Sequence, residues 1–130
     1  MKEVYDFLKE AKTYYLATVD GNIPKVRPFG TIDIFEDKLY IQTGKSKEVY
    51  KQILNNNNVE ICTFNNGKWI RINGKLIPDD RIEAKRHMLD NYPELRGMYN
   101  EEDDNTIVLY FESFEATIYS FTEPPKTIKY

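Results

Sequence analysis

Two cations and two hydroxyl groups stand close together in the first half of this chain, at Arg27, Thr43, Ser46 and Lys47. A helix predicted to begin after Gly44, with Ser46 as its N-cap, would add the free N–H groups of its first turn. Cationic side chains and helix-start N–H groups are common ligands of bound anions. The spacing therefore predicts an anion site, and a phosphate group is the ligand that fits it best.

The overall charge makes these cations more informative. The 130 residues carry a net charge of −3, so Arg27 and Arg71 do not belong to a uniformly basic surface. An acidic balance also argues against general affinity for nucleic acid. The alternative interpretation is a surface with scattered cations, in which Lys45, Lys51 and even Lys47 form a solvated helix face.

A strand, a tight turn, a returning strand and a short helix are expected to position this cluster, between Pro24 and Asn58. The first strand alternates in polarity as far as Phe35, and Glu36-Asp37 fits a two-residue hairpin turn. The strand from Leu39 to Thr43 then returns beside it. The helix is expected to turn Val49, Tyr50, Ile53 and Leu54 inward, and to end at four asparagines, Asn55 to Asn58, because Asn tolerates the left-handed backbone.

The remaining elements complete a mainly β pattern, a β-rich α+β class. Asn66-Gly67 is the clearest hairpin turn in the sequence. Gly74 inside a strand indicates a bulge or a close backbone approach, and the last β-rich stretch is expected to bend near Glu112-Ser113. About six strands joined by tight turns, with three short helices, predict a small antiparallel β-barrel forming one domain over residues 1–130. The other strands are expected at Tyr14 to Val19, Val59 to Phe64, Trp69 to Ile77 and Ile107 to Phe121. The other helices are expected at Lys2 to Lys12 and from a cap at Asp79 or Asp80 to about Asn91, the second with Ile82, Arg86 and Leu89 along one stripe.

Three motifs occur in a fixed order: R-P-x-G at residues 27–30, Y-x-Q-T-G-x-S-K at 40–47 and N-N-x-V at 56–59. Together they resemble the FMN-binding split barrels of the pyridoxamine 5′-phosphate oxidase-like superfamily. The short chain brings the resemblance closest to the nitroimidazole-resistance (Nim) type. It extends from Tyr14 to about Tyr119.

The resemblance implies a set of cofactor-binding residues. Arg27, Ser46 and Lys47 would hold the FMN phosphate, and Trp69 falls where relatives often carry a Gln that reaches the flavin across a subunit interface. Trp69 could instead be a half-buried aromatic that packs against Phe64. The full expected set is Arg27, Pro28, Phe29, Gly30, Gln42, Thr43, Ser46, Lys47, Trp69 and Arg71.

The resemblance also implies a function: an FMN-dependent oxidoreductase that passes electrons to a small aromatic or nitro-aromatic acceptor, with NADH or NADPH as a candidate donor. The catalytic residues stay unknown, because the cofactor does the electron chemistry. The final segment FTEPPKTIKY has no Arg and no His. This argues against oxidation of vitamin B6 phosphates, whose oxidases bear both in that segment.

A homodimer with FMN at its interface is expected, because a small barrel offers too little wall for the isoalloxazine ring. One alternative is a flavin- or ligand-binding protein without turnover. The other is a nucleic-acid-binding barrel that stacks bases on Phe29, Phe64 and Trp69, which the acidic charge disfavours.

Other chemistry finds little support. His87 is the only histidine and is expected to be neither catalytic nor a metal ligand, and Cys62 is expected to be an inert core thiol. No metal is expected. A single cysteine, a charged start without the features of a signal peptide and no long apolar run favour a cytoplasmic protein that does not enter a membrane.

Overall fold

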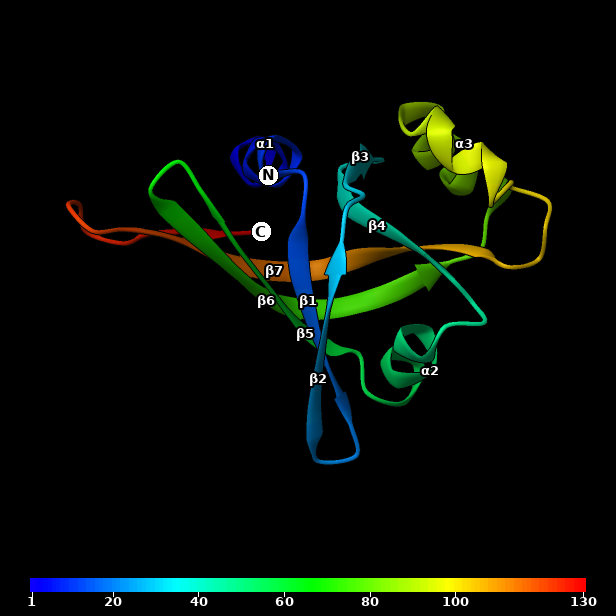
Figure 1. Cartoon of the computed structure of the whole chain (residues 1–130), viewed down its shortest axis with the longest axis horizontal. Helices are drawn as coiled ribbons and strands as arrows, with labels where there is room; N and C mark the ends of the chain where they lie inside the picture. Colours follow the sequence, from blue (N-terminus) through cyan, green and yellow to red (C-terminus); the bar gives the residue numbers. More distant parts are fainter.

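The computed structural model describes residues 1–130 and contains one eight-stranded sheet with three helices around it (Figure 1). All strand pairs are antiparallel, which confirms the mainly β prediction and the split-barrel fold. The helices are α1 (Lys2–Ala11), α2 (Glu48–Asn55), α3 (Ile82–Asn91) and the 3-10 helix η1 (Pro93–Gly97). The strands are β1 (Tyr14–Asp20), β2 (Ile23–Phe29), β3 (Asp33–Phe35), β4 (Lys38–Gly44), β5 (Asn58–Asn65), β6 (Lys68–Asp79), β7 (Thr106–Ser120) and β8 (Lys126–Lys129).

The sheet is split along one seam. Its strand order is β2-β1-β5-β6-β7-β4-β3, with β8 paired to β7, so β2 and β3 lie at opposite ends of the order although they are consecutive in the chain. The residues 30–32 therefore cross the seam. Two tyrosine hydroxyls fix this crossing: Tyr14 donates to the carbonyl of Thr31 at 2.6 Å, and Tyr92 accepts the N–H of Ile32 at 3.1 Å.

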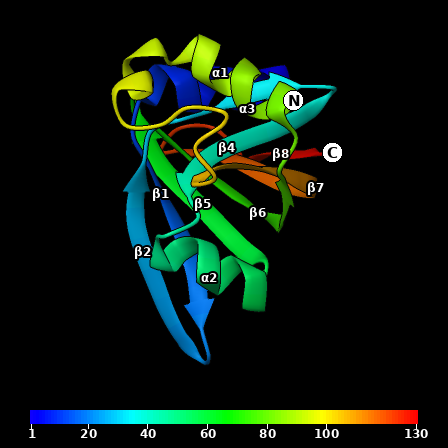
Figure 2. The same cartoon turned by 90° about the vertical axis from the view of Figure 1, so that its right-hand side faces the viewer.

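Inward-facing aliphatic side chains from alternate strand positions fill the core, among them Leu16, Ile41, Ile61, Ile70 and Ile72. Helix α1 closes one end with Val4 and Leu8, which follow the helical i, i+4 spacing. Figures 1 and 2 show α1 and α3 on one side of the sheet and α2 on the opposite side. None of the helices has both the length and the apolar composition needed to cross a membrane.

The predicted hairpin turns are confirmed. Glu36 and Asp37 have φ values of 49° and 60°, and Asn66 and Gly67 have 52° and 75°. Left-handed residues at both turn positions match the right-handed twist of the flanking strands.

The predicted irregularity at Gly74 is also confirmed. Gly74 pairs with Phe114 and Leu76 with Phe111, so Glu112 and Ser113 lie opposite the single residue Lys75. This bulge brings the backbones close together: a Cβ on Gly74 would lie 2.5 Å from the carbonyl oxygen of Ser113. The bend expected near Glu112-Ser113 falls at this bulge, within one continuous β7.

Several local predictions were wrong. The expected first strand is interrupted, because β2 ends at Phe29 and β3 begins only at Asp33. Strand β8 was not expected. Cys62 is exposed rather than part of the core, because its position on β5 points away from the buried face of Val59 and Ile61.

The helix ends also differ from the predictions. Helix α2 has Lys47 at its N-cap position with no side-chain cap, and Asn56 at its C-terminal end is extended, with φ −149°. Gln52 is buried on its inner face, whereas Leu54 is exposed. Helix α3 follows Arg81 rather than an aspartate cap and buries Ala84, Lys85, Met88 and Leu89 instead of the expected stripe of Ile82, Arg86 and Leu89.

β2 forms one edge of the sheet and is exposed along most of its length. It pairs with β1 around the two-residue turn Gly21-Asn22, with Pro24 opposite Val19 and Pro28 opposite Tyr15.

Candidate functional site

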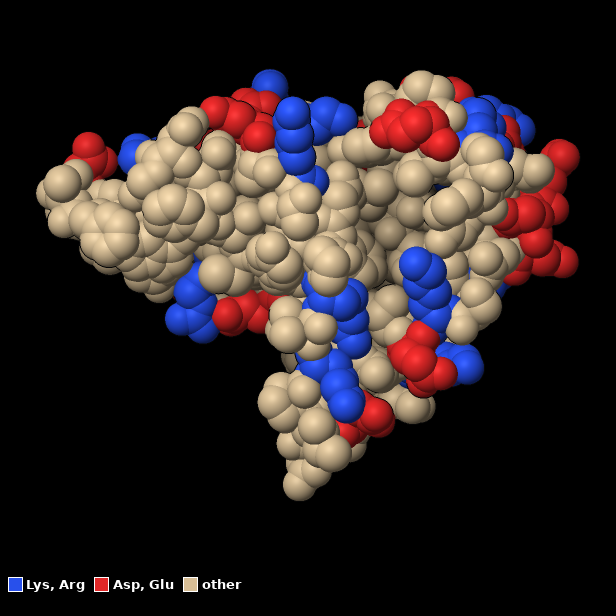
Figure 3. Space-filling model, viewed as in Figure 1, with Lys and Arg blue, Asp and Glu red and all other residues tan.

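A cavity of about 350 Å³ lies at the seam, between β2 and β4, under the segment that follows α3. Basic side chains gather over β2 and the start of α2, beside the hollowed part of this face (Figure 3). Seven of the ten predicted site residues line the cavity: Arg27, Pro28, Phe29, Gly30, Gln42, Thr43 and Lys47.

Arg27 is held by neutral oxygen atoms alone. Its Nη1 donates to the hydroxyl of Thr18 at 2.7 Å and to the carbonyl of Leu16 at 3.3 Å, and its Nη2 donates to Oε1 of Gln52 at 2.7 Å. A guanidinium has five N–H donors, so these bonds leave the Nε–H and one N–H of Nη2 without a protein acceptor. Partial burial lowers the pKa of Arg27, and no carboxylate opposes this effect.

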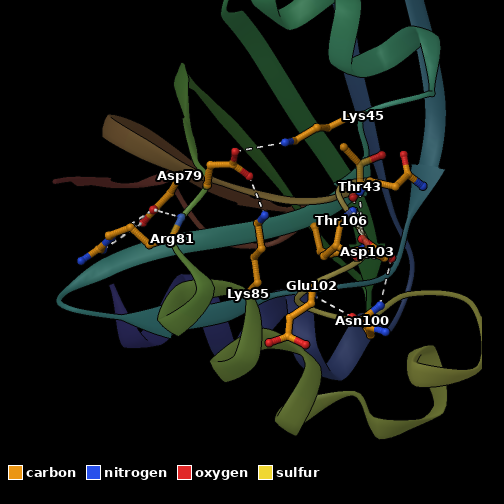
Figure 4. A network of polar contacts seen from close by, with 12 residues as sticks. Thr43, Lys45, Asp79, Arg81, Lys85, Asn100, Glu102, Asp103 and Thr106 are labelled. Carbon is orange, nitrogen blue, oxygen red and sulfur yellow. Dashed lines mark hydrogen bonds and ion pairs between the residues drawn. The ribbon is translucent and has the colours of Figure 1, made fainter.

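Lys47 is likewise without an acidic partner, although its neighbours are paired. Lys51 contacts Glu48 at 3.3 Å, and Lys45 contacts Asp80 at 3.0 Å. The Asp80 carboxylate also accepts a hydrogen bond from the buried Lys85, and this bond is the main cause of the lowered pKa of Asp80. Lys45 is therefore engaged in an ion pair (Figure 4) with the segment that precedes α3, while Lys47 lines the cavity.

The loop between β4 and α2 is held by Asn105. The Asn105 carbonyl accepts the N–H of Lys45 at 2.7 Å, and its Oδ1 accepts the N–H of Ser46 at 3.0 Å. Gly44 lies close beside it, since a Cβ there would lie 3.0 Å from Asn105 Nδ2 and the Asn105 side chain would have to shift slightly to admit a larger residue. The N–H of Ser46 is thus engaged outside the cavity, and Ser46 does not line it. The N–H of Val49, whose residue does line the cavity, has no protein acceptor.

Asp103 supports Asn105 in turn, and Figure 4 shows Asp103 beside Thr106. Its carboxylate accepts the N–H of Asn105 at 2.9 Å and that of Thr106 at 2.7 Å. Burial opposes ionisation of Asp103, but backbone N–H groups from Thr106, Asn100 and Asn105 outweigh it and lower the pKa to about 2. This acidic loop is therefore a support for the β4–α2 loop.

Trp69 and Arg71 lie outside the cavity, on β6. Trp69 stacks on Tyr119 with ring centroids 5.4 Å apart and lies opposite Phe64 in the neighbouring strand. Arg71 is paired with Glu60 at 2.7 Å. Trp69 forms an exposed aromatic face with Phe64, Tyr119 and Phe121, of which Phe64 is 59% and Phe121 80% exposed.

The sequence analysis missed the far wall of the cavity. Tyr92, Leu95, Met98 and Tyr99 come from η1 and its flanks, and Glu94 is the only carboxylate residue in the lining. This stretch has no periodic pattern, so only long-range contacts place it. Gln52 behind Arg27 could have been found, because it stands i+3 from the buried Val49 on one helix face.

His87 has a carboxylate partner that was not expected. Its Nδ1 lies 2.6 Å from Oδ2 of Asp33, whose Oδ1 accepts from Asn91 at 2.7 Å. Burial raises the pKa of Asp33 despite these contacts. The pair fastens α3 to β3 and does not line the cavity. The structure contains no group of three or more His, Cys, Asp or Glu residues that could hold a metal ion.

Fold and cavity together define a split β-barrel protein with unpaired cations at its open seam. The family model described as pyridoxamine 5′-phosphate oxidase matches residues 1–109, and the chain belongs to this family. This confirms the resemblance carried by the three sequence motifs. No curated protein matches the chain.

Solved structures agree with this assignment. A NimC/NimA family protein from Clostridium acetobutylicum is 42% identical, with a TM-score of 0.97 over 100% of this chain and 92% of that one. General Stress Protein 26 from Bacillus anthracis is 20% identical, with a TM-score of 0.75 over 99% of this chain and 98% of that one. A pyridoxamine 5′-phosphate oxidase-related, FMN-binding protein from Nostoc punctiforme is 17% identical, with a TM-score of 0.63 over 97% of this chain and 90% of that one. The last two show the fold alone.

Proposed function

We propose that this protein binds FMN in the seam cavity and acts as a flavin-dependent oxidoreductase. The observation that carries the proposal is the pair of cations without acidic partners, Arg27 and Lys47, at a cavity whose other walls combine aromatic and aliphatic side chains with polar ones. A phosphomonoester carries a charge of about −1.5 to −2 at neutral pH, which matches two cations. The Nostoc relative, described as FMN-binding, supports the choice of cofactor.

The residues present fit such a ligand. Arg27 offers two unused N–H donors, Lys47 offers its ammonium group, and Val49 offers an unpaired N–H from the first turn of α2. Pro28, Phe29 and Gly30 would lie along the ring system, with Gln42 and Thr43 on the second strand. Bound FMN supplies hydride or electron transfer, and the chain's own residues bind and orient it.

The acceptor we propose is a small aromatic or nitro-aromatic compound, with NADH or NADPH as donor. Its support is the 42% identity with a NimC/NimA family protein over the whole chain. Flavin binding without turnover is the competing function, and the reduction experiment below separates the two.

The first expected result is a yellow protein. Purified protein should show the visible spectrum of oxidised flavin, and the chromophore released on denaturation should be FMN rather than FAD. Addition of NADH or NADPH should bleach the flavin, and a nitroimidazole should then restore its colour. A colourless protein that does not take up FMN would refute the cofactor. Bound flavin that stays oxidised with every donor would refute turnover and favour the non-catalytic function.

We further propose that FMN lies at the interface of a homodimer. The aromatic face of Phe64, Trp69, Tyr119 and Phe121 is the surface that we assign to the second copy, because exposed aromatic side chains are enriched at interface cores. Two copies related by a two-fold axis would make two equivalent sites. Trp69 and Arg71, which do not reach the cavity of their own subunit, would then act on that of the partner.

Replacement of Trp69 by Asp should therefore weaken dimerisation and FMN retention together, since it places a charge within the aromatic face. Sedimentation should give twice the 15.4 kDa chain mass for the parent protein and a shift towards one chain mass for the variant. Lys75→Asp, an exposed position further along β6, is the control. A parent monomer that keeps FMN at full occupancy would contradict the dimer.

A further inference from the structure

Gln52 is a buried polar residue on α2 whose side chain meets Arg27 from behind the cavity. We propose that Gln52 sets the affinity of the site for a phosphate group, because it orients the Arg27 guanidinium without neutralising its charge. This inference rests on the proposed function and identifies a positioning residue in it.

The contacts form a closed triangle. Gln52 Oε1 accepts from Arg27 Nη2 at 2.7 Å and from the hydroxyl of Thr18 at 2.6 Å, and the Thr18 oxygen accepts from Arg27 Nη1 at 2.7 Å. A guanidinium only donates, so the Gln52 atom that faces it must be the carbonyl oxygen. Gln52 and Thr18 are 8% and 2% exposed, which leaves water little access to compete for these bonds.

A buried or half-buried arginine is usually paired with a carboxylate, because an unpaired charge in a low-dielectric site is costly. Here the oxygen atoms behind Arg27 belong to an amide, a hydroxyl and a backbone carbonyl. Such groups fix the direction of the guanidinium, yet they leave its full positive charge to attract an anion in the cavity. A glutamate at position 52 would have nearly the same shape and would cancel that charge.

The test is the substitution Gln52→Glu, with FMN and riboflavin as paired ligands. FMN affinity should fall about 30-fold, the effect of losing one charge-assisted contact. Riboflavin has the same ring but no phosphate, so its affinity should stay unchanged. Thermal unfolding of the ligand-free variant should be no easier than that of the parent, because the introduced carboxylate would pair with Arg27.

A second variant separates charge from geometry. Gln52→Met keeps the volume and adds no charge, so FMN affinity should fall by only a few-fold through the lost orientation of Arg27. Equal losses of FMN and riboflavin affinity in Gln52→Glu would make Gln52 an ordinary packing residue. Unchanged FMN affinity in that variant would also overturn the proposal.

Inorganic phosphate, titrated alone, distinguishes this inference from the proposed function. Phosphate should bind the parent protein more tightly than Gln52→Glu, whether or not flavin binds. A parent protein that binds phosphate but no flavin would refute the FMN proposal and leave the role of Gln52 standing. Equal or absent phosphate binding in both proteins, without a difference in FMN affinity, would refute the role of Gln52.

Discussion

Alanine in place of Lys47 should weaken FMN binding about 30-fold. The variant removes one charge-assisted contact to the phosphate, worth about 2 kcal/mol. The effect should be large because Lys47 lines the cavity and pairs with no carboxylate, so its full positive charge is available to the phosphate. Titration of FMN into ligand-free protein, followed by the quenching of flavin fluorescence, measures the change in dissociation constant.

Lys45→Ala is the matched control, two residues away on the same loop. Lys45 is bonded to Asp80 at 3.0 Å and does not line the cavity, so its loss should change FMN affinity far less. Similar, small effects of both variants would place the anion site elsewhere on the molecule.

Gly74→Ala should destabilise the fold by about 3 kcal/mol, near the upper end of typical overpacking costs. The new Cβ would lie 2.5 Å from the Ser113 carbonyl and 2.9 Å from the Phe111 ring, and backbone on the opposite strand cannot move aside without disturbing the bulge. The midpoint of thermal unfolding should fall by roughly 10 °C.

Gly97→Ala provides the comparison for this change. A Cβ on Gly97 would meet no atom within 4 Å, and its backbone does not require a left-handed conformation. Its unfolding midpoint should therefore stay close to that of the parent protein. If Gly74→Ala behaved in the same way, the close approach at the bulge would not be essential.

Features set by neighbouring residues were predictable from sequence. The turns at Glu36-Asp37 and Asn66-Gly67 depend on residue types that tolerate positive φ, and their prediction was correct. The bulge at Gly74 was predictable for a related reason, since glycine inside a strand indicates a close approach. The clustering of Arg27, Thr43 and Lys47 followed from the strand–loop–helix order.

Features set by distant residues were not predictable. Ser46 was predicted to cap α2, but Lys47 occupies the N-cap position. Asn105, from a loop far along the chain, accepts the Ser46 N–H and fixes the backbone that leads into α2. Helical periodicity predicted that Leu54 is buried. It is exposed, because the short helix α2 packs on the sheet through only a narrow face. The wall formed by Tyr92 and Met98 depends on how α3 packs against β3.

The prolines of β2 affect how this protein behaves at high concentration. Around a two-residue turn the hydrogen-bonded pairs alternate, so the N–H positions of residues 24, 26 and 28 face away from β1 towards the open edge. Two of these three positions are proline, which leaves Val26 as the only donor on that edge. The other edge strands, β3 and β8, have only three and four residues. An open sheet whose edge strands are short or blocked by proline is a poor template for further strands, so copies should associate face to face and stop at a closed assembly rather than grow into fibrils.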